Sequence, residues 1–229
     1  MLLLLVTPAF ASTVQDLVVA MTEVATVQTG SPTVLADWRA LVDALDLADT
    51  PAALAEYSRV RLAFEATRDG GLWGLQWAIT NRDPTERYVW ASLFAWRGAE
   101  VTGVAECDEL SAMFASLARA MGVQEVGLFW PTSNHTVAVW TTPGETGTVR
   151  VVVPTSQIFL AGGETLGTTG FDPATQRTIY RYGTKALPLD TELSPELFLR
   201  LTATLGQTAR PAADLQRQRD ARAAHFGGS

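Results

Sequence analysis

The stretch that decides the fold is residues 104–123, which read VAECDELSAMFASLARAMGV. Apolar residues recur at helical spacing from Cys107 to Met121, and Gly122 is suited to end a helix. This pattern predicts a helix over residues 107–121 that buries one face. Cys107 would lie at its N-terminal end. It is the one cysteine of the chain, so no disulfide can form within the chain.

The period of the pattern changes from helical to extended after this segment. A strand is predicted over residues 123–130, and residues 135–141 alternate in the manner of a second strand. Alternate residues of that strand form two sets, Val137, Val139 and Thr141 in one and Thr136, Ala138 and Trp140 in the other. The PGETG of residues 143–147 predicts a turn, and residues 149–153 predict a third strand. Together they predict an antiparallel hairpin.

Helical patterns flank this sheet on both sides. Helices are predicted at residues 13–26, 33–48, 50–67, 83–96, 194–205 and 211–226. A short helix or a turn is predicted at residues 72–80, and a further strand at 176–183. The order of helices, then an antiparallel sheet, then helices predicts an α+β fold. We divide it into an N-terminal helical region (12–50), a core (51–190) and a C-terminal helical extension (191–229).

The composition is that of a globular, acidic protein. Of the 229 residues, 47% are hydrophobic, and the formal net charge is −7. The 17 basic residues are scattered rather than clustered, so we expect neither nucleic acid nor an anionic membrane as a partner. One cysteine and two histidines make no zinc ligand set. The glycines of residues 162–167 lack the phosphate-binding pattern, and no cofactor is expected.

Residues 1–11, MLLLLVTPAFA, combine an apolar run with an A-x-A motif. This pattern is typical of a secretory signal segment, and the run is shorter than the ~20 residues that span a bilayer. The alternative is a buried N-terminal strand or helix. With the signal, the protein would be secreted or would lie in the periplasm or cell envelope.

Cys107 and His135 are the candidate reactive pair. A helix N-terminus favours a thiolate and offers N–H groups to a developing oxyanion. A histidine at the start of the adjoining strand would serve as the base. The alternative is that Cys107 is a core cysteine and His135 a hydrogen-bonded residue beside a turn. The adjacent acids at 106, 108 and 109 would raise the thiol pKa, and an imidazolium would be needed to offset them.

Two segments resemble the transglutaminase-like core, a member of the papain-like cysteine protease superfamily. Residues 104–123 are similar to the family's cysteine helix, which ends in a Leu-x-Arg-Ala-x-Gly-Ile/Val segment, and residues 134–140, NHTVAVW, are similar to its histidine strand. The resemblance covers roughly residues 55–157. It implies a papain-like fold in which Cys107 is the nucleophile, His135 the base, and an acidic residue on the next strand orients the histidine.

This chain departs from the family at the third position. Residues 152–155 read VVPT where the family has Val-Asp-Pro-Thr, so Val153 stands in place of the acid. A valine cannot orient an imidazole. Substitutes that could hydrogen-bond the ring are Thr155, Ser156, Gln157 and Asp172. We take Thr155 as the candidate, and Asp172, which precedes a proline, is more typical of a turn.

Further residues allow both a functional and a structural interpretation. Trp96, Trp130 and Trp140 could wall a substrate groove, although tryptophan usually packs in or near a core. Gln76 could donate a hydrogen bond to an oxyanion, but nothing in the sequence fixes its distance from Cys107.

The first functional hypothesis is an exported cysteine-dependent acyl-transfer enzyme that acts on a peptide or protein. Transfer to water would make it a peptidase or amidase, and transfer to an amine a transglutaminase; we favour hydrolysis. The second hypothesis is a catalytically impaired domain of the same fold that binds a peptide or protein in the cell envelope. The third is a structural scaffold in which Cys107 is an unreactive core residue.

Overall fold

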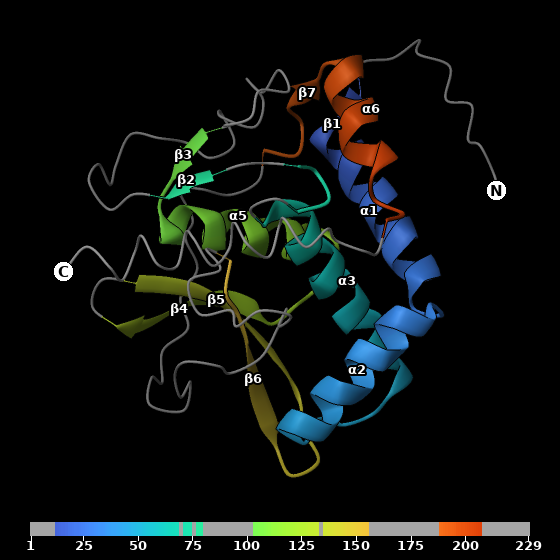
Figure 1. Cartoon of the computed structure of the whole chain (residues 1–229), viewed down its shortest axis with the longest axis vertical. Helices are drawn as coiled ribbons and strands as arrows, with labels where there is room; N and C mark the ends of the chain where they lie inside the picture. Colours follow the sequence, from blue (N-terminus) through green and yellow to red (C-terminus); the bar gives the residue numbers. More distant parts are fainter. Residues whose placement is uncertain are drawn as a thin grey trace.

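The computed structural model describes residues 12–68, 71–74, 77–79, 103–132, 135–155 and 188–207 (Figure 1). For residues 78, 79, 103, 104, 130–132 and 135 it describes the backbone alone. The predicted segments at residues 1–11, 83–96, 176–183 and 211–226 lie outside the described residues.

The described chain combines helices with an antiparallel sheet. The helices are α1 (Val14–Gln28), α2 (Pro32–Leu45), α3 (Pro51–Thr67), α5 (Cys107–Ala120) and α6 (Pro195–Ala203). The strands are β1 (Ser12–Thr13), β2 (Trp77–Ile79), β3 (Gly103–Ala105), β4 (Val126–Thr132), β5 (His135–Pro143), β6 (Thr148–Val153) and β7 (Glu192–Leu193). The order of helices, sheet and a further helix confirms the predicted α+β class.

The helices begin where their sequence supplies capping groups. Thr13 and Asp16 form a reciprocal capping box at the start of α1. The hydroxyl of Thr50 accepts from the N–H of Ala53 (3.2 Å) before α3, and that of Ser194 accepts from the N–H of Leu197 (3.2 Å) before α6. In both helices proline takes the first helical position, which needs no N–H partner. These starts match the predicted ones.

The main sheet has the order β4-β5-β6 with antiparallel pairing throughout. Trp140 pairs with Val126 on one side and Val151 on the other. The register of β4 against β5 shifts between Phe129 and Thr132. The β5–β6 hairpin closes with Pro143 paired to Thr148, which confirms the predicted turn at residues 143–147.

The two faces of the sheet bury different sets of side chains, as strand alternation requires. One set joins the main core and comprises Val126, Leu128, Ala138, Trp140, Val151 and Val153. The other set is a separate buried cluster of Phe129, Val137, Val139 and Val152. Ala138 and Trp140 therefore alternate with Val137 and Val139, as predicted.

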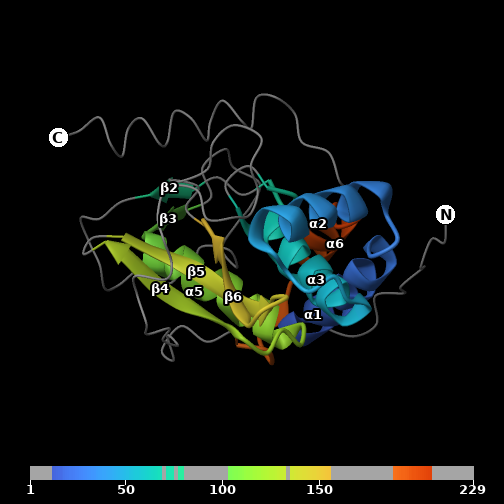
Figure 2. The same cartoon turned by 90° about the horizontal axis from the view of Figure 1, so that it is seen from below.

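Helix α5 connects the sheet to the helical half of the molecule. It contacts β4 and β5 on one side and α3 on the other. In Figures 1 and 2, α5 and the sheet occupy one side of the molecule, while α1, α2, α3 and α6 gather on the other. Met113, Phe114 and Leu117 of α5 are fully buried. A single core cluster includes residues of all three predicted regions, such as Leu17 of α1 and Leu201 of α6.

Four short strands, β1, β2, β3 and β7, were not predicted from the sequence. Strand β1 pairs antiparallel with β7, which ties the start of α1 to the segment before α6. Strand β2 pairs parallel with β3, and β3 directly precedes α5, the helix that begins at Cys107. Of the short helix or turn predicted at 72–80, the turn is present at residues 71–74, but residues 77–79 form β2. A strand of three residues is too short to show a period of its own.

In the parts of the chain that the structure describes, no helix is both long enough and apolar enough to cross a membrane.

The burial of α5 predicts its contribution to stability. Replacing Leu117, which is fully buried, by alanine should lower the free energy of unfolding by about 2–5 kcal/mol through lost contacts and a residual cavity. The matched control is Leu199→Ala on α6, where the side chain is 61% exposed, and where the change should be within about 0.5 kcal/mol. Denaturant unfolding measures both. Equal effects would contradict the placement of α5 in the core.

Candidate active site

Cys107 is the first residue of α5. Glu106 precedes it in extended conformation as the N-cap, and the Glu109 carboxylate accepts a hydrogen bond from the N–H of Glu106 (3.1 Å). Glu109 is buried. One of the acids that flank the thiol in sequence is thus engaged in capping the helix that carries Cys107.

The sulfur of Cys107 lies against the start of β5. The backbone N–H of Thr136 donates a hydrogen bond to Cys107 Sγ, with 3.3 Å between nitrogen and sulfur. Thr136 directly follows His135, the first residue of β5. The backbones of the two residues predicted to form the reactive pair therefore come together from segments 28 positions apart in the sequence. The side chain of His135 lies outside the described part of the structure.

The environment of Cys107 raises its pKa. Burial is the largest cause, since only 6% of the residue is exposed. The N–H of Thr136 lowers the pKa, the charge of Asp108 raises it, and the N–H of Asp108 and the Thr136 hydroxyl lower it. Among the described groups, the effect of burial on the thiol pKa is larger than that of the hydrogen bonds at the start of α5. The helix N-terminus was predicted to favour a thiolate. A cationic neighbour would be required to reverse this balance.

The described pairing of β5 with β6 does not reach His135. Its last pair on this side is Ala138 with Val153. Strand β6 ends at Val153, and the N–H of Thr155 turns back to the Val153 carbonyl (2.9 Å). The turn at Thr155 thus ends the described pairing before it reaches His135. The side chain of Val153 is in the core.

Thr155, the predicted orienting residue, has a partner on α5, while its predicted contact with the His135 ring lies outside the described residues. Its hydroxyl lies 2.6 Å from the hydroxyl of Ser111 on α5, and both side chains are buried. Ser111 was not singled out from the sequence. Ser111 lies one helical turn after Cys107, on the buried face of α5. A polar residue on a face that is otherwise mostly apolar is the sequence signal that could have identified it.

Of the remaining candidates, the structure describes the side chain of Trp140 alone, and it lies in the core. Trp140 is fully buried in the core, where its ring lies 6.3 Å from that of Tyr57, so it does not wall an exposed groove. The other side chains that were named as candidates lie outside the described residues: Gln76, Trp96, Trp130, Ser156, Gln157 and Asp172. Within the ranges that the structure describes, no group of three or more His, Cys, Asp or Glu residues could hold a metal ion.

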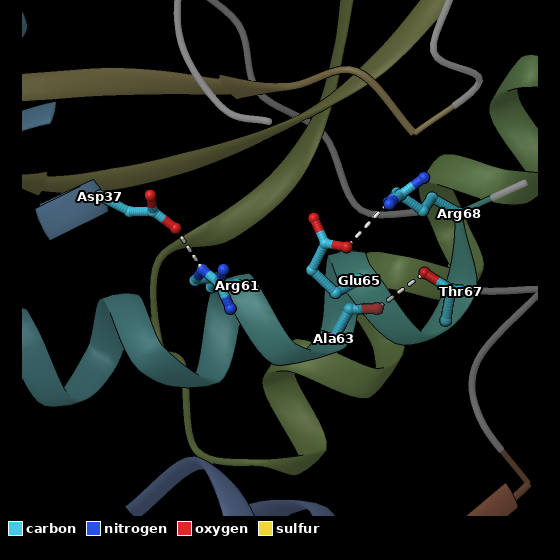
Figure 3. Close-up of polar contacts among 6 residues, drawn as sticks. All are labelled: Asp37, Arg61, Ala63, Glu65, Thr67 and Arg68. Carbon is cyan, nitrogen blue, oxygen red and sulfur yellow. Dashed lines mark hydrogen bonds and ion pairs between the residues drawn. The ribbon is translucent and has the colours of Figure 1, made fainter. Parts of the chain in front are cut away.

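A second set of buried polar side chains lies along α3 (Figure 3). The Arg61 Nε donates to an Asp37 carboxylate oxygen of α2 (2.8 Å), and the Arg68 Nε donates to Glu65 (2.9 Å). Burial raises the pKa of the nearby Tyr57 well above its ordinary range, so its hydroxyl stays neutral. Because the charges are paired, we interpret this set as structural.

The buried pair on α3 predicts a measurable difference from an exposed one. Glu65→Gln would remove the carboxylate charge from the buried ion pair of Glu65 with Arg68, and should cost about 3–5 kcal/mol of unfolding free energy. The matched control is Glu196→Gln on α6, whose carboxylate is 76% exposed and bonds Arg200 (2.9 Å). That change should be worth less than about 1 kcal/mol. Chemical denaturation measures both, and a neutral Glu65→Gln would contradict the role assigned to the pair.

Comparison of the chain with protein-family models, with curated proteins and with solved structures found no match.

Proposed function

We propose that the chain has the papain-like, transglutaminase-core fold and acts as a cysteine-dependent acyl-transfer enzyme. Cys107 is the nucleophile and His135 the base. The observation that carries the proposal is the hydrogen bond from the Thr136 N–H to Cys107 Sγ (3.3 Å). Because Thr136 directly follows His135, this bond brings the backbone of His135 close to the thiol. A cysteine at a helix N-terminus beside a histidine strand is the arrangement that activates a thiol nucleophile.

The reaction follows from these two groups. The His135 imidazole takes the thiol proton, and the Cys107 thiolate attacks an amide carbonyl carbon, forming a C–S bond. The oxyanion lies near the N-terminus of α5, whose dipole favours a developing negative charge. As the C–N bond breaks, the imidazolium returns the proton to the leaving amine. Water, deprotonated by His135, then cleaves the thioester and restores the thiol.

The substrate we propose is a peptide or protein, with water as the favoured acceptor and an amine as the alternative. The apolar N-terminal segment supports action outside the cytoplasm, in a secreted or cell-envelope setting.

A non-catalytic peptide-binding domain is the second candidate. Two observations favour it: Cys107 is buried with a raised pKa, and β6, Thr148–Val153, supplies no carboxylate to orient His135. Without a coupled imidazolium the thiol would stay protonated near neutral pH, and the site could bind but not acylate.

Alkylation of Cys107 by iodoacetamide between pH 4 and 10 separates the two candidates. Since the chain has one cysteine, the rate reports a single thiol. The enzyme predicts a fast reaction with an apparent pKa below the ordinary ~8.5, and a loss of that reactivity in His135→Ala. The sign follows from the imidazolium, which stabilises the thiolate and so lowers the thiol pKa.

The control is His225→Ala, which removes the other histidine of the chain and should leave the profile unchanged. A thiol that reacts only above its ordinary pKa, with the same profile in wild type and His135→Ala, would contradict the enzyme hypothesis and favour the binding domain.

A further inference from the structure

Ser111 occupies the centre of a buried hydroxyl network beside Cys107. Its Oγ lies 2.7 Å from the Cys107 carbonyl oxygen, 3.3 Å from the Thr136 carbonyl oxygen and 2.6 Å from the Thr155 Oγ1. The side chains of Ser111, Thr136 and Thr155 are all buried. These contacts join three elements, because the residues belong to α5, to β5 and to the turn that follows β6.

The donors and acceptors of the network can be assigned from its geometry. Ser111 has one hydroxyl proton, and both carbonyl oxygens can only accept. The shorter contact assigns that proton to the Cys107 carbonyl (2.7 Å). The Thr155 hydroxyl then donates to Ser111 Oγ, which has free acceptor capacity. Removing the Thr155 hydroxyl would therefore leave a buried oxygen of Ser111 without its donor, which is costly.

The network surrounds the contact between the thiol and β5. Thr136 donates its N–H to Cys107 Sγ (3.3 Å), while its carbonyl faces Ser111 Oγ (3.3 Å). Both backbone polar groups of Thr136 thus meet the N-terminal part of α5, one at Cys107 and the other at Ser111. A shift of Ser111 or Thr155 would change the position of Thr136 relative to the sulfur.

We propose that Ser111 and Thr155 are positioning residues, a hydroxyl pair that fixes the start of α5 against β5 and so holds Cys107 Sγ in contact with the Thr136 N–H. The catalytic meaning of this pair rests on the proposed function, but its effect on the sulfur does not. This role of Thr155, exerted through helix α5, is separate from the contact with the imidazole ring that the sequence predicts.

The effect of the pair is measured on the thiol. Among the described residues, the charged group that acts on Cys107 is Asp108, on its own helix, and the variants below leave it in place. His135, whose neighbour Thr136 contacts the sulfur, is varied separately. Loss of the Thr136 donors removes a stabilisation of the thiolate, so the thiol pKa should rise.

The experiment uses the full chain labelled with ¹³Cβ-cysteine and ¹⁵N, which gives one cysteine Cβ signal. In wild type, the Thr136 amide should titrate in step with Cys107. In Thr155→Val and Ser111→Ala this coupling should be lost, the thiol pKa should rise, and alkylation at pH 7 should slow about ten-fold, the equivalent of one hydrogen bond. Thr155→Ser should restore the wild-type values.

The matched control is Thr67→Val. Thr67 is equally buried, but its hydroxyl donates only within α3, to the Ala63 carbonyl (2.8 Å, Figure 3). This variant should lower the melting temperature while leaving the Cys107 pKa unchanged.

Two results would overturn the positioning role. The first is a wild-type Thr136 amide signal that does not titrate with the Cys107 thiol. This test does not depend on the folding of any variant. The second is a set of variants that lose stability as Thr67→Val does but keep the thiol pKa and alkylation rate. Failure of the proposed function is recognised separately, by an unchanged alkylation profile in His135→Ala, in which the Ser111 and Thr155 effects should persist.

Discussion

The contact between the Cys107 sulfur and the Thr136 N–H (3.3 Å) is the interaction on which the account of this protein depends. It joins the first residue of α5 to the start of β5, and thereby brings the cysteine helix and the histidine strand together. The core on either side of α5 supports this contact, since the helix packs against β4, β5 and α3. A displacement of the buried face of α5 would therefore act on the sulfur as well as on stability.

The energetics of the sulfur are a balance between burial and hydrogen bonding. Desolvation disfavours the thiolate, and the donors from Thr136 and Asp108 favour it. Burial prevails among the described groups, so the proposed activity of Cys107 would depend on the charge state of His135. Exclusion of water from a site strengthens the electrostatic interactions between its charged groups. The same exclusion makes a thiolate without a cationic partner costly. In the proposed enzyme, a protonated His135 imidazole would make this site reactive, and without it the thiol would stay protonated.

The long elements could be predicted from the sequence because their periods are strong. Cys107 to Ala120 and His135 to Pro143 were found within a few residues, as was the hairpin turn. The side-chain pairing of the site could not be predicted. The sequence does not show that β6 ends at Val153 and that the chain turns at Thr155, where the Thr155 hydroxyl meets Ser111. Ser111 was overlooked because helical periodicity records which residues are buried and not which hydroxyls meet across elements.

The most direct measurement is the distance between Cys107 Sγ and the nearer imidazole nitrogen of His135 in a crystal structure of the wild-type protein. The account predicts about 3–4 Å, the separation at which a base takes the proton of its nucleophile. It also predicts that the Thr136 N–H still contacts the sulfur. A ring more than about 6 Å from the sulfur, with its nitrogens bonded elsewhere, would contradict the reactive pair and leave Cys107 as a buried residue of a binding domain.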